Sequence, residues 1–364
     1  MLSVLIPSRN EQFLAPTVRD VLVQSRGSIE VIVALDGYWP DPPLVDDPRL
    51  NVLHWAQPRG MRPCINAMVA VSKGEHLMKL DAHCALPEGF DTVLSAECDE
   101  DWVVVPRRHR LDPETWALQD VGKPPIDAHY LSYPYERPGD PSCGLHGTVW
   151  TERARAREHV LLDDEMSSQG SCWFMTRRHW DRIVGPMDVE HYGNFIQEFQ
   201  EVGLKTWLSG GQVKVNKKTW YAHLHKGRIY GRGYHLTKQE QTRGAVYCTD
   251  YWMHDRWPQR TRNLSWLIEY FWPVPGWPLD WERLPVASST SARQPDILSA
   301  RYGLSEQKSL DVTDVVRALW GSSFKVTNAT LGVGNVHPGK RKTLFVTTAE
   351  NVILMFTERT QVRA

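Results

Sequence analysis

The 364-residue chain has no long apolar run. The first one, residues 2–7, ends at the polar residues Ser8, Arg9, Asn10 and Glu11. No later segment reaches the roughly 18 uninterrupted apolar residues that a membrane span requires. The same break shows that the chain does not begin like a signal peptide. We therefore expect a soluble, cytoplasmic protein with no membrane partner.

An excess of charge of one sign is also missing. The 42 lysines and arginines balance 43 aspartates and glutamates, so the formal net charge is −1. This balance excludes a protein that binds polyanions over its whole surface, and nucleic-acid contact would require a local patch. The six cysteines contain no CxxC pair, which excludes a zinc knuckle and favours the reduced thiols of a cytoplasmic protein.

Tryptophan, in contrast, is abundant, with sixteen residues. Burial of aromatic surface accounts for most of them, and stacking on sugars or bases is the usual functional reason for such an excess.

Apolar runs rich in valine, isoleucine and leucine alternate with segments of helical period in the first 110 residues. This alternation predicts a parallel sheet that is buried on both faces. Polar residues directly follow two of these runs, at Asp36 and at Asp81-Ala82-His83. In a nucleotide-binding α/β fold, such residues face the ligand crevice. The predicted strands are 2–7, 30–35, 75–80 and 102–106, and the predicted helices are 11–24 and 59–72.

The middle of the chain is less regular. Residues 111–165 lose their periodicity, which predicts a long, partly mobile insertion over a site. Further on, residues 195–208 have helical spacing, and Gly210-Gly211 after them is a signal for a helix C-terminus, so a helix is predicted there. Additional strands are predicted at 171–175, 212–215 and 219–223.

We expect two domains and a linker. Residues 1–285 form the nucleotide-binding domain, residues 286–296 form a linker rich in serine and threonine, and residues 297–364 form a small β-rich domain. No internal repeat is evident in the sequence.

Asp81 and His83 are the sharpest chemical signal. A carboxylate and an imidazole two residues apart, at the end of a buried strand, can both reach a divalent cation that bridges the phosphates of a nucleotide. Mixed oxygen and nitrogen ligands favour Mn²⁺. The alternative is an exposed turn with a capping aspartate and an incidental histidine.

The context of these residues resembles a known family. Residues 59–86, RGMRPCINAMVAVSKGEHLMKLDAHCAL, look like the corresponding part of metal-dependent GT-A glycosyltransferases, in particular the polypeptide N-acetylgalactosaminyltransferases. SVLIPSRNE (3–11) and EVIVALDG (30–37) resemble the first two strands of family 2 glycosyltransferases. The resemblance implies a GT-A fold, which is a Rossmann-like mixed sheet with helices on both faces.

The resemblance also implies roles on the donor side. Asp36 takes the place of the acid that binds the base or ribose of the nucleotide, and Pro7, Arg9 and Asn10 belong to the turn that holds the uracil edge. The arginine of the family's helix motif is replaced by isoleucine here. Arg62 is a candidate substitute, and a plain surface arginine is the alternative.

Two later segments resemble the family's acceptor and metal sides. Glu198 aligns with an acceptor-side glutamate and is the candidate catalytic residue, because Phe199 replaces the acid that follows it in inverting relatives. His223 fits the place of the third metal ligand, and His225 competes with it because both lie on one face of a strand. Lys226 and Arg228 follow in a loop suited to closure over a diphosphate.

These features together predict a glycosyltransferase. It would use a UDP-sugar and Mn²⁺ or Mg²⁺ to glycosylate a hydroxyl of a macromolecule, with protein serine or threonine favoured. A DNA glycosyltransferase acting on a hydroxymethylated base is an alternative, because residues 214–243 are basic and aromatic and the lectin repeats of the polypeptide transferases are missing. The third hypothesis is a catalytically inactive module that binds a sugar or a nucleotide.

Overall fold

The computed structural model describes residues 1–120, 122–134, 144–279, 281, 297–305, 307–320, 323–334, 337–348, 353–359 and 361–363. The chain divides into two compact units, Met1–Val286 and Ala287–Ala364. The linker predicted at 286–296 lies outside the described residues. Each unit has its own buried apolar core.

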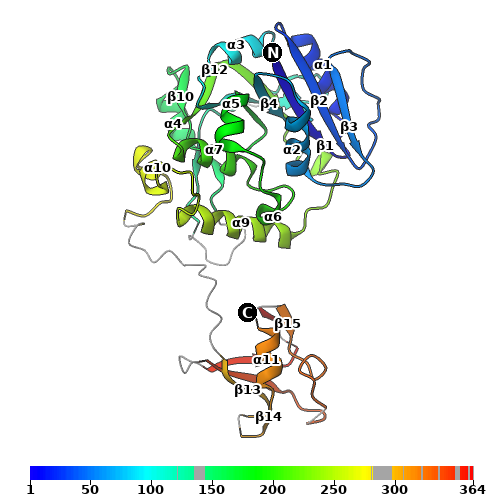
Figure 1. The fold of residues 1–364 in the computed structure, drawn as a ribbon, viewed down its shortest axis with the longest axis vertical. Helices are drawn as coiled ribbons and strands as arrows, with labels where there is room; N and C mark the ends of the chain where they lie inside the picture. Colours follow the sequence, from blue (N-terminus) through cyan, green and yellow to red (C-terminus); the bar gives the residue numbers. More distant parts are fainter. Residues whose placement is uncertain are drawn as a thin grey trace. The chain divides into compact units, whose positions relative to one another are not determined.

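The first unit is built on one large mixed sheet (Figure 1). Its strands are β1 (Leu2–Ser8), β2 (Ile29–Asp36), β3 (Leu50–Trp55), β4 (His76–Leu80), β5 (Cys84–Ala85), β6 (Trp102–Asp112), β7 (Ala117–Leu118), β10 (Leu162–Asp164), β11 (Cys172–Thr176) and β12 (Gln212–His223). The order across the sheet is β10-β12-β6-β11-β4-β1-β2-β3, with β5 beside β12 and β7 beside β6.

The sheet combines parallel and antiparallel pairings. β1 pairs in parallel with both β2 and β4, β2 with β3, and β12 with β6. β11 is antiparallel to β4 and to β6. All of β2 is buried and only Pro7 of β1 is not fully buried, as expected for apolar strands covered on both faces. The predicted α/β fold is therefore confirmed.

Helices flank the sheet on both faces (Figure 1). An ion pair joins α2 to α7, and the backbone N–H of Arg26, two residues after the end of α1, donates to Asp91 in α3. The helices are α1 (Leu14–Gln24), α2 (Met61–Val71), α3 (Phe90–Ala96), α4 (Thr151–Ala156), α5 (Arg177–His179), the π-helical turn η1 (Trp180–Val184), α6 (Val189–Tyr192), α7 (Glu198–Leu208), α8 (Gly227–Tyr230), α9 (Lys238–Met253) and α10 (Leu264–Tyr270).

Two regions differ from the sequence-based expectation. The predicted strands 212–215 and 219–223 form one strand, β12, with an irregularity between Asn216 and Trp220. The described part of 111–165 contains an antiparallel pair of β8 (His129–Leu131) and β9 (Gly147–Val149), whose neighbours Leu145 and Trp150 are buried, while residues 121 and 135–143 lie outside the described part of the chain. Local periodicity missed this packing because its contacts are distant in sequence.

The second unit contains a four-stranded antiparallel sheet in the order β14-β13-β16-β17 and a separate pair of β15 and β18. One helix, α11, packs on β13. Its elements are β13 (Ile297–Gly303), β14 (Ser309–Asp311), α11 (Thr313–Leu319), β15 (Ser323–Lys325), β16 (Thr343–Thr348), β17 (Ile353–Thr357) and β18 (Gln361–Arg363).

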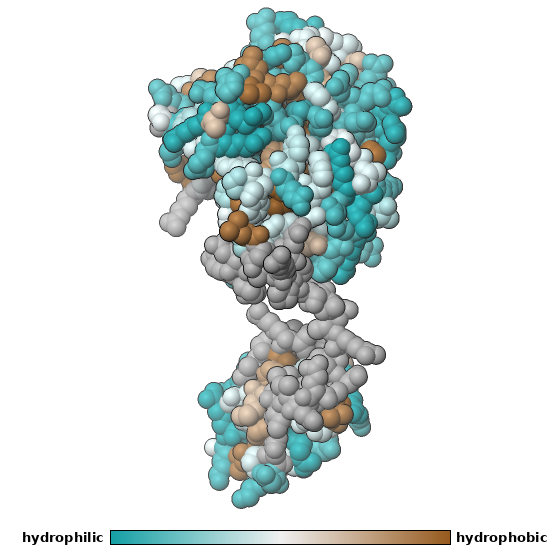
Figure 2. Space-filling view, turned by 90° about the vertical axis from the view of Figure 1, so that its left-hand side faces the viewer, coloured by the Kyte–Doolittle hydropathy of each residue, from teal (hydrophilic) through white to brown (hydrophobic). Residues whose placement is uncertain are grey.

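The space-filling view shows a mainly hydrophilic face on both units, with scattered hydrophobic groups (Figure 2). Among the described residues, no helix is both long and apolar enough to cross a membrane. The five cysteines of the described part form no disulfide.

Candidate functional site

A cavity of about 950 Å³ lies at the carboxyl ends of the central strands. The ends of β1, β2, β4 and β12 contribute to it, together with the start of α7 and the segment that leads into α9. The parallel strands bring these ends to one edge of the sheet, where α/β proteins bind their ligands. Residues far apart in the sequence therefore face one space.

Asp81, His83 and His223 form a cluster in this cavity. One ligand atom from each lies within 4.8 Å of the others. His223 Nε2 is 3.2 Å and His83 Nε2 is 4.0 Å from Asp81 Oδ2. His225 is outside this cluster and its Nε2 lies 3.4 Å from the Arg108 guanidinium. The structure thus brings His223, and not His225, to Asp81.

Two neighbouring side chains hold the histidines in place. Glu11 Oε2 lies 3.0 Å from His83 Nδ1 as an ion-pair contact without hydrogen-bond geometry, so its negative charge favours a proton on Nδ1, which leaves Nε2 for a metal. Arg108 Nη2 lies 3.2 Å from His223 Nδ1. A guanidinium can only donate, so in this arrangement Nε2 of His223 carries the proton and donates to Asp81. A metal bound at Nε2 would replace that hydrogen bond.

The protonation states suit a cation. Burial would raise the pKa of Asp81, but the Lys79 ammonium and the two histidines outweigh it and hold the pKa well below its usual value. Burial lowers the pKa of His223 to about 3. One carboxylate oxygen and two imidazole nitrogens form a donor set that Mn²⁺ accepts. These three residues fit a divalent metal ion.

The expected nucleoside side of the cavity contains Asp36, Pro7 and Arg9. The buried carboxylate of Asp36 accepts hydrogen bonds from the backbone N–H groups of Arg59 (2.5 Å) and Gly60 (2.9 Å). Arg9 Nη1 is 3.9 Å from the same carboxylate. One carboxylate thereby fixes the turn before α2 and orients a cation at the cavity wall.

Asn10 has a different place from the one expected. It adopts φ 49°, and its side-chain amide donates to the Gly233 carbonyl at 2.7 Å. Asn10 therefore ties the end of β1 to the segment between α8 and α9 and does not line the cavity.

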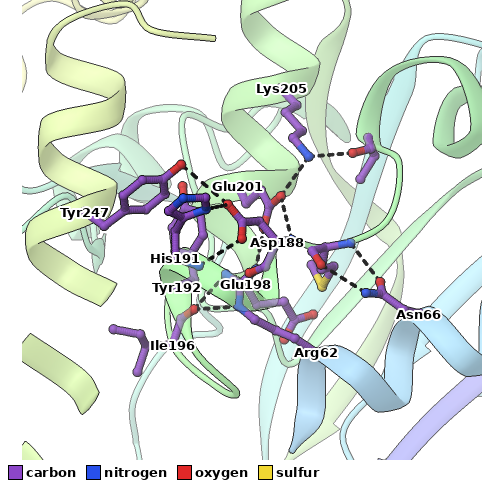
Figure 3. Close-up of polar contacts among 12 residues, drawn as sticks. Arg62, Asn66, Asp188, His191, Tyr192, Ile196, Glu198, Glu201, Lys205 and Tyr247 are labelled. Atoms are coloured by element: carbon purple, nitrogen blue, oxygen red, sulfur yellow. Dashed lines mark hydrogen bonds and ion pairs between the residues drawn. The ribbon is translucent and has the colours of Figure 1, made fainter. Parts of the chain in front are cut away.

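Arg62 is not brought to the cavity. Its side chain is fully buried, pairs with Glu201 and donates to the Ile196 carbonyl from Nε (3.1 Å) and Nη2 (2.7 Å). Glu201 also contacts Lys205, at 2.7 Å. Figure 3 shows this network between α2 and α7. Neither the expected donor-side role of Arg62 nor a surface position fits this arrangement, because the buried side chain bonds to protein groups through all three of its nitrogens.

Glu198 lines the cavity at the start of α7 and is only 5% exposed. The Trp173 indole donates to its Oε1 at 2.6 Å, and Lys79 Nζ lies 3.2 Å from its Oε2. Burial raises the pKa of Glu198, while Lys79 partly offsets that effect. The carboxylate is thus held in one position at the cavity wall.

The loop after β12 contributes a cation. Lys226 lines the cavity and pairs with Glu11. The side chain of Arg228 lies outside the described residues. Arg232, also at the cavity, lies over the Phe195 ring at 5.5 Å.

Sequence reasoning missed three residues around the metal cluster: Lys79, Glu11 and Arg108. A lysine within an apolar strand was a visible signal for Lys79, because lysine is almost never buried without a partner. Glu11 ends the SRNE segment and was a visible candidate. Nothing in the sequence around Arg108 points to the site, because only the pairing of β6 with β12 brings its guanidinium to His223.

Comparisons with known proteins agree with this geometry. The model of glycosyl transferase family 2 matches residues 3–184. That match covers half of the chain and includes Asp36, Asp81 and His83, so the chain belongs to this family of glycosyltransferases. Glu198 and His223 lie beyond the matched residues. No curated protein matches the chain.

Among similar solved structures, GalNAc-T7 shares the fold, with a TM-score of 0.55. Its crystal structure with UDP, GalNAc and Mn²⁺ is 14% identical, and the similarity covers 97% of this chain and 68% of that one. The mannosyltransferase PcManGT from Pyrobaculum calidifontis, in complex with GDP-Man and Mn²⁺, is 14% identical over 63% and 58% of the two chains, with a TM-score of 0.39. S. aureus TarS 1–349 in complex with UDP is 16% identical over 31% and 36%, with a TM-score of 0.25.

Proposed function

We propose that this glycosyltransferase uses a UDP-sugar and Mn²⁺, or Mg²⁺ in its place, to glycosylate a hydroxyl of a macromolecular acceptor. The observation that carries the proposal is the convergence of Asp81, His83 and His223 in the same cavity as Asp36. A metal cluster beside a nucleoside-side carboxylate is the arrangement that a nucleotide diphosphate donor requires. GalNAc-T7, the structural relative with the same fold, was solved with UDP and Mn²⁺.

The charges around the cluster support a diphosphate donor. Asp81, Glu198 and Glu11 carry three negative charges, and the three cations in contact with these groups or with His223 are Lys79, Lys226 and Arg108. The site is therefore balanced before a metal binds. A divalent ion brings a charge of +2, which matches the two negative charges of a sugar diphosphate.

The residues divide the reaction between them. A bound divalent ion would supply Lewis-acid stabilisation of the leaving diphosphate. Asp36 and Arg9 hold the nucleoside end, and Lys226 adds positive charge next to the leaving group. Glu198 orients the acceptor hydroxyl or takes its proton, since its raised pKa makes it a stronger base than an exposed glutamate.

A serine or threonine of a protein is the favoured acceptor. The support is the dense sequence resemblance of residues 59–86 to the polypeptide N-acetylgalactosaminyltransferases and the shared fold with GalNAc-T7. The acceptor would approach past Phe195 and Tyr234, whose rings lie 5.4 Å apart at the cavity.

Hydroxymethylated DNA is the second candidate acceptor. The observation that favours it is a group of exposed cations next to the cavity: Arg232, Lys238 and Arg243. Together with Tyr234, these side chains could contact phosphates and stack on a base.

The test is UDP release from a panel of UDP-sugars with Mn²⁺. We expect activity that is lost, by at least about a hundredfold, in Asp81→Ala and in His83→Ala. Folded protein that binds Mn²⁺ and releases no UDP from any donor would instead identify an inactive module. With the donor known, transfer to a protein extract is compared with transfer to hydroxymethylated DNA, and activity on DNA alone would replace the favoured acceptor.

A further inference from the structure

Lys79 is a buried lysine at the centre of the site. It lies in β4, two residues before Asp81, and is 1% exposed. Its ammonium lies 2.6 Å from Asp81 Oδ1, 2.6 Å from the Gly170 carbonyl and 3.2 Å from Glu198 Oε2. The ammonium donates hydrogen bonds to Asp81 and to the Gly170 carbonyl and forms an ion pair with Glu198. Lys79 thus bridges a metal-cluster carboxylate and the acceptor-side carboxylate.

The bridge gives the two oxygens of Asp81 different roles. Oδ1 faces the ammonium, whereas Oδ2 faces the imidazoles of His83 and His223. Only one oxygen of Asp81 is therefore free to bind a cation. Without the ammonium, both oxygens could chelate the ion.

The bridge also holds Glu198 away from the metal cluster. Trp173 is the register partner of Lys79 in the pairing of β11 with β4, and its indole fixes the second oxygen of Glu198. Both oxygens of Glu198 are thereby bound to donors on the adjacent strands. Removing the ammonium would leave the buried Glu198 carboxylate near the partly exposed Asp81 carboxylate, and a metal ion is the natural counter-ion for such a pair.

We propose that Lys79 is a positioning residue that separates the two carboxylates, so that Asp81 binds the metal through one oxygen and Glu198 stays outside the metal shell for the acceptor. This inference rests on the proposed metal-dependent function. It goes beyond that function by assigning a role to a residue that belongs to neither the metal ligands nor the donor site.

The proposal predicts that substitution of Lys79 and substitution of Glu198 change the affinity for Mn²⁺ in opposite directions. Lys79→Met removes a positive charge next to the metal and frees Asp81 Oδ1, so Mn²⁺ should bind about tenfold more tightly while turnover falls. Glu198→Gln leaves the ammonium to Asp81 alone, so Mn²⁺ should bind about tenfold more weakly. The double variant Lys79→Met/Glu198→Gln should return to within about threefold of the wild-type affinity.

Mn²⁺ alone, titrated into the full-length protein and followed by the EPR signal of the free ion, gives these affinities without a donor or an acceptor. A failure of the proposed reaction would leave the titration interpretable, so the two hypotheses fail separately. Lys218→Met and Glu97→Gln are matched controls, because they break a surface pair at 2.6 Å and should leave Mn²⁺ affinity unchanged.

A merely structural role of Lys79 would weaken Mn²⁺ binding in both single variants. Weaker or unchanged binding in folded Lys79→Met, checked by circular dichroism, would overturn the proposal. If Lys79→Met does not fold, Glu198→Gln decides, since unchanged or tighter binding in that variant contradicts the bridge.

Discussion

At the residue scale, the site is a set of paired charges, each of which has a defined partner. Asp81 and Glu198 share Lys79, and Glu11 is shared by His83 and Lys226. Buried charges are tolerated only with such partners. The chemistry of each group therefore depends on residues that are distant in sequence.

Glu11 provides a direct test of this dependence. Glu11→Gln should weaken Mn²⁺ binding about ten- to a hundredfold, because the carboxylate that orients His83 through Nδ1 is replaced by a neutral amide. Isothermal titration with Mn²⁺ measures the change. Glu88→Gln, which removes the partner of Arg26 on the surface, is the control. Equal affinities of Glu11→Gln and the wild type would show that Glu11 does not support the metal.

At the scale of elements, a buried ion pair connects the helices that carry the two sides of the site. Arg62 on α2 and Glu201 on α7 are fully or nearly fully buried, and Arg62 also binds the Ile196 carbonyl, two residues before Glu198. The network in Figure 3 therefore sets the position of the first turn of α7 relative to α2.

Arg62→Met should lower the free energy of unfolding by about 3–5 kcal/mol, because it removes the ion-pair partner of Glu201 Oε2 and leaves Lys205 and the Asp188 backbone N–H, both on Oε1, to hold a buried carboxylate. Urea denaturation measures this loss. Arg178→Met breaks an exposed pair with Glu100 and should cost less than about 1 kcal/mol. Similar losses in the two variants would contradict the role assigned to the buried pair.

A buried histidine links α5 to α7 and makes stability depend on pH. His179 Nε2 is 2.9 Å from the Thr206 hydroxyl, which itself donates to the Val202 carbonyl, so the imidazole is the donor. Its Nδ1 is buried without a partner, and burial lowers the pKa of His179 to about 4. A second proton has no acceptor there.

The pKa of His179 is lower in the folded than in the unfolded chain, where it is about 6.5. Its contribution is therefore complete above pH 6.5 and decreases as the pH falls towards 4. Between pH 7.5 and 5 this histidine should account for a loss of about 2 kcal/mol in the free energy of unfolding. Urea titrations of the wild type and of His179→Gln at both pH values measure the contribution of His179 to this loss. The control is His159→Gln, because His159 is exposed. An unaltered pH dependence in His179→Gln would refute this assignment.

At the scale of the whole molecule, every residue assigned to the site belongs to the first compact unit, Met1–Val286. The second unit has its own core of buried residues.

A chain that ends at Val286 should therefore fold, bind Mn²⁺ within about twofold of the full-length affinity and release UDP at a similar rate. Circular dichroism and the Mn²⁺ titration check this expectation. A truncated chain that folds but loses Mn²⁺ binding would show that residues 287–364 contribute to the site.

The amino-acid sequence was enough to predict the α/β fold of the first unit. The apolar runs 2–7 and 30–35 became β1 and β2 with nearly the same bounds, because strands buried on both faces must be continuously apolar. It also determined Asp36, Asp81 and His83 as candidates, since each directly follows such a run and the ends of parallel strands share one edge.

The tertiary structure was needed to identify the third metal ligand and the positions of Arg62 and Lys79. It brought His223 and not His225 to Asp81, because the register of β12 against β5 and β6 is fixed by pairing between distant segments. Arg62 lies in a buried ion pair with Glu201 and not at the expected donor site. Lys79 lies between the carboxylates of Asp81 and Glu198. Local periodicity describes one strand or helix at a time, whereas burial and charge pairing depend on which elements pack together.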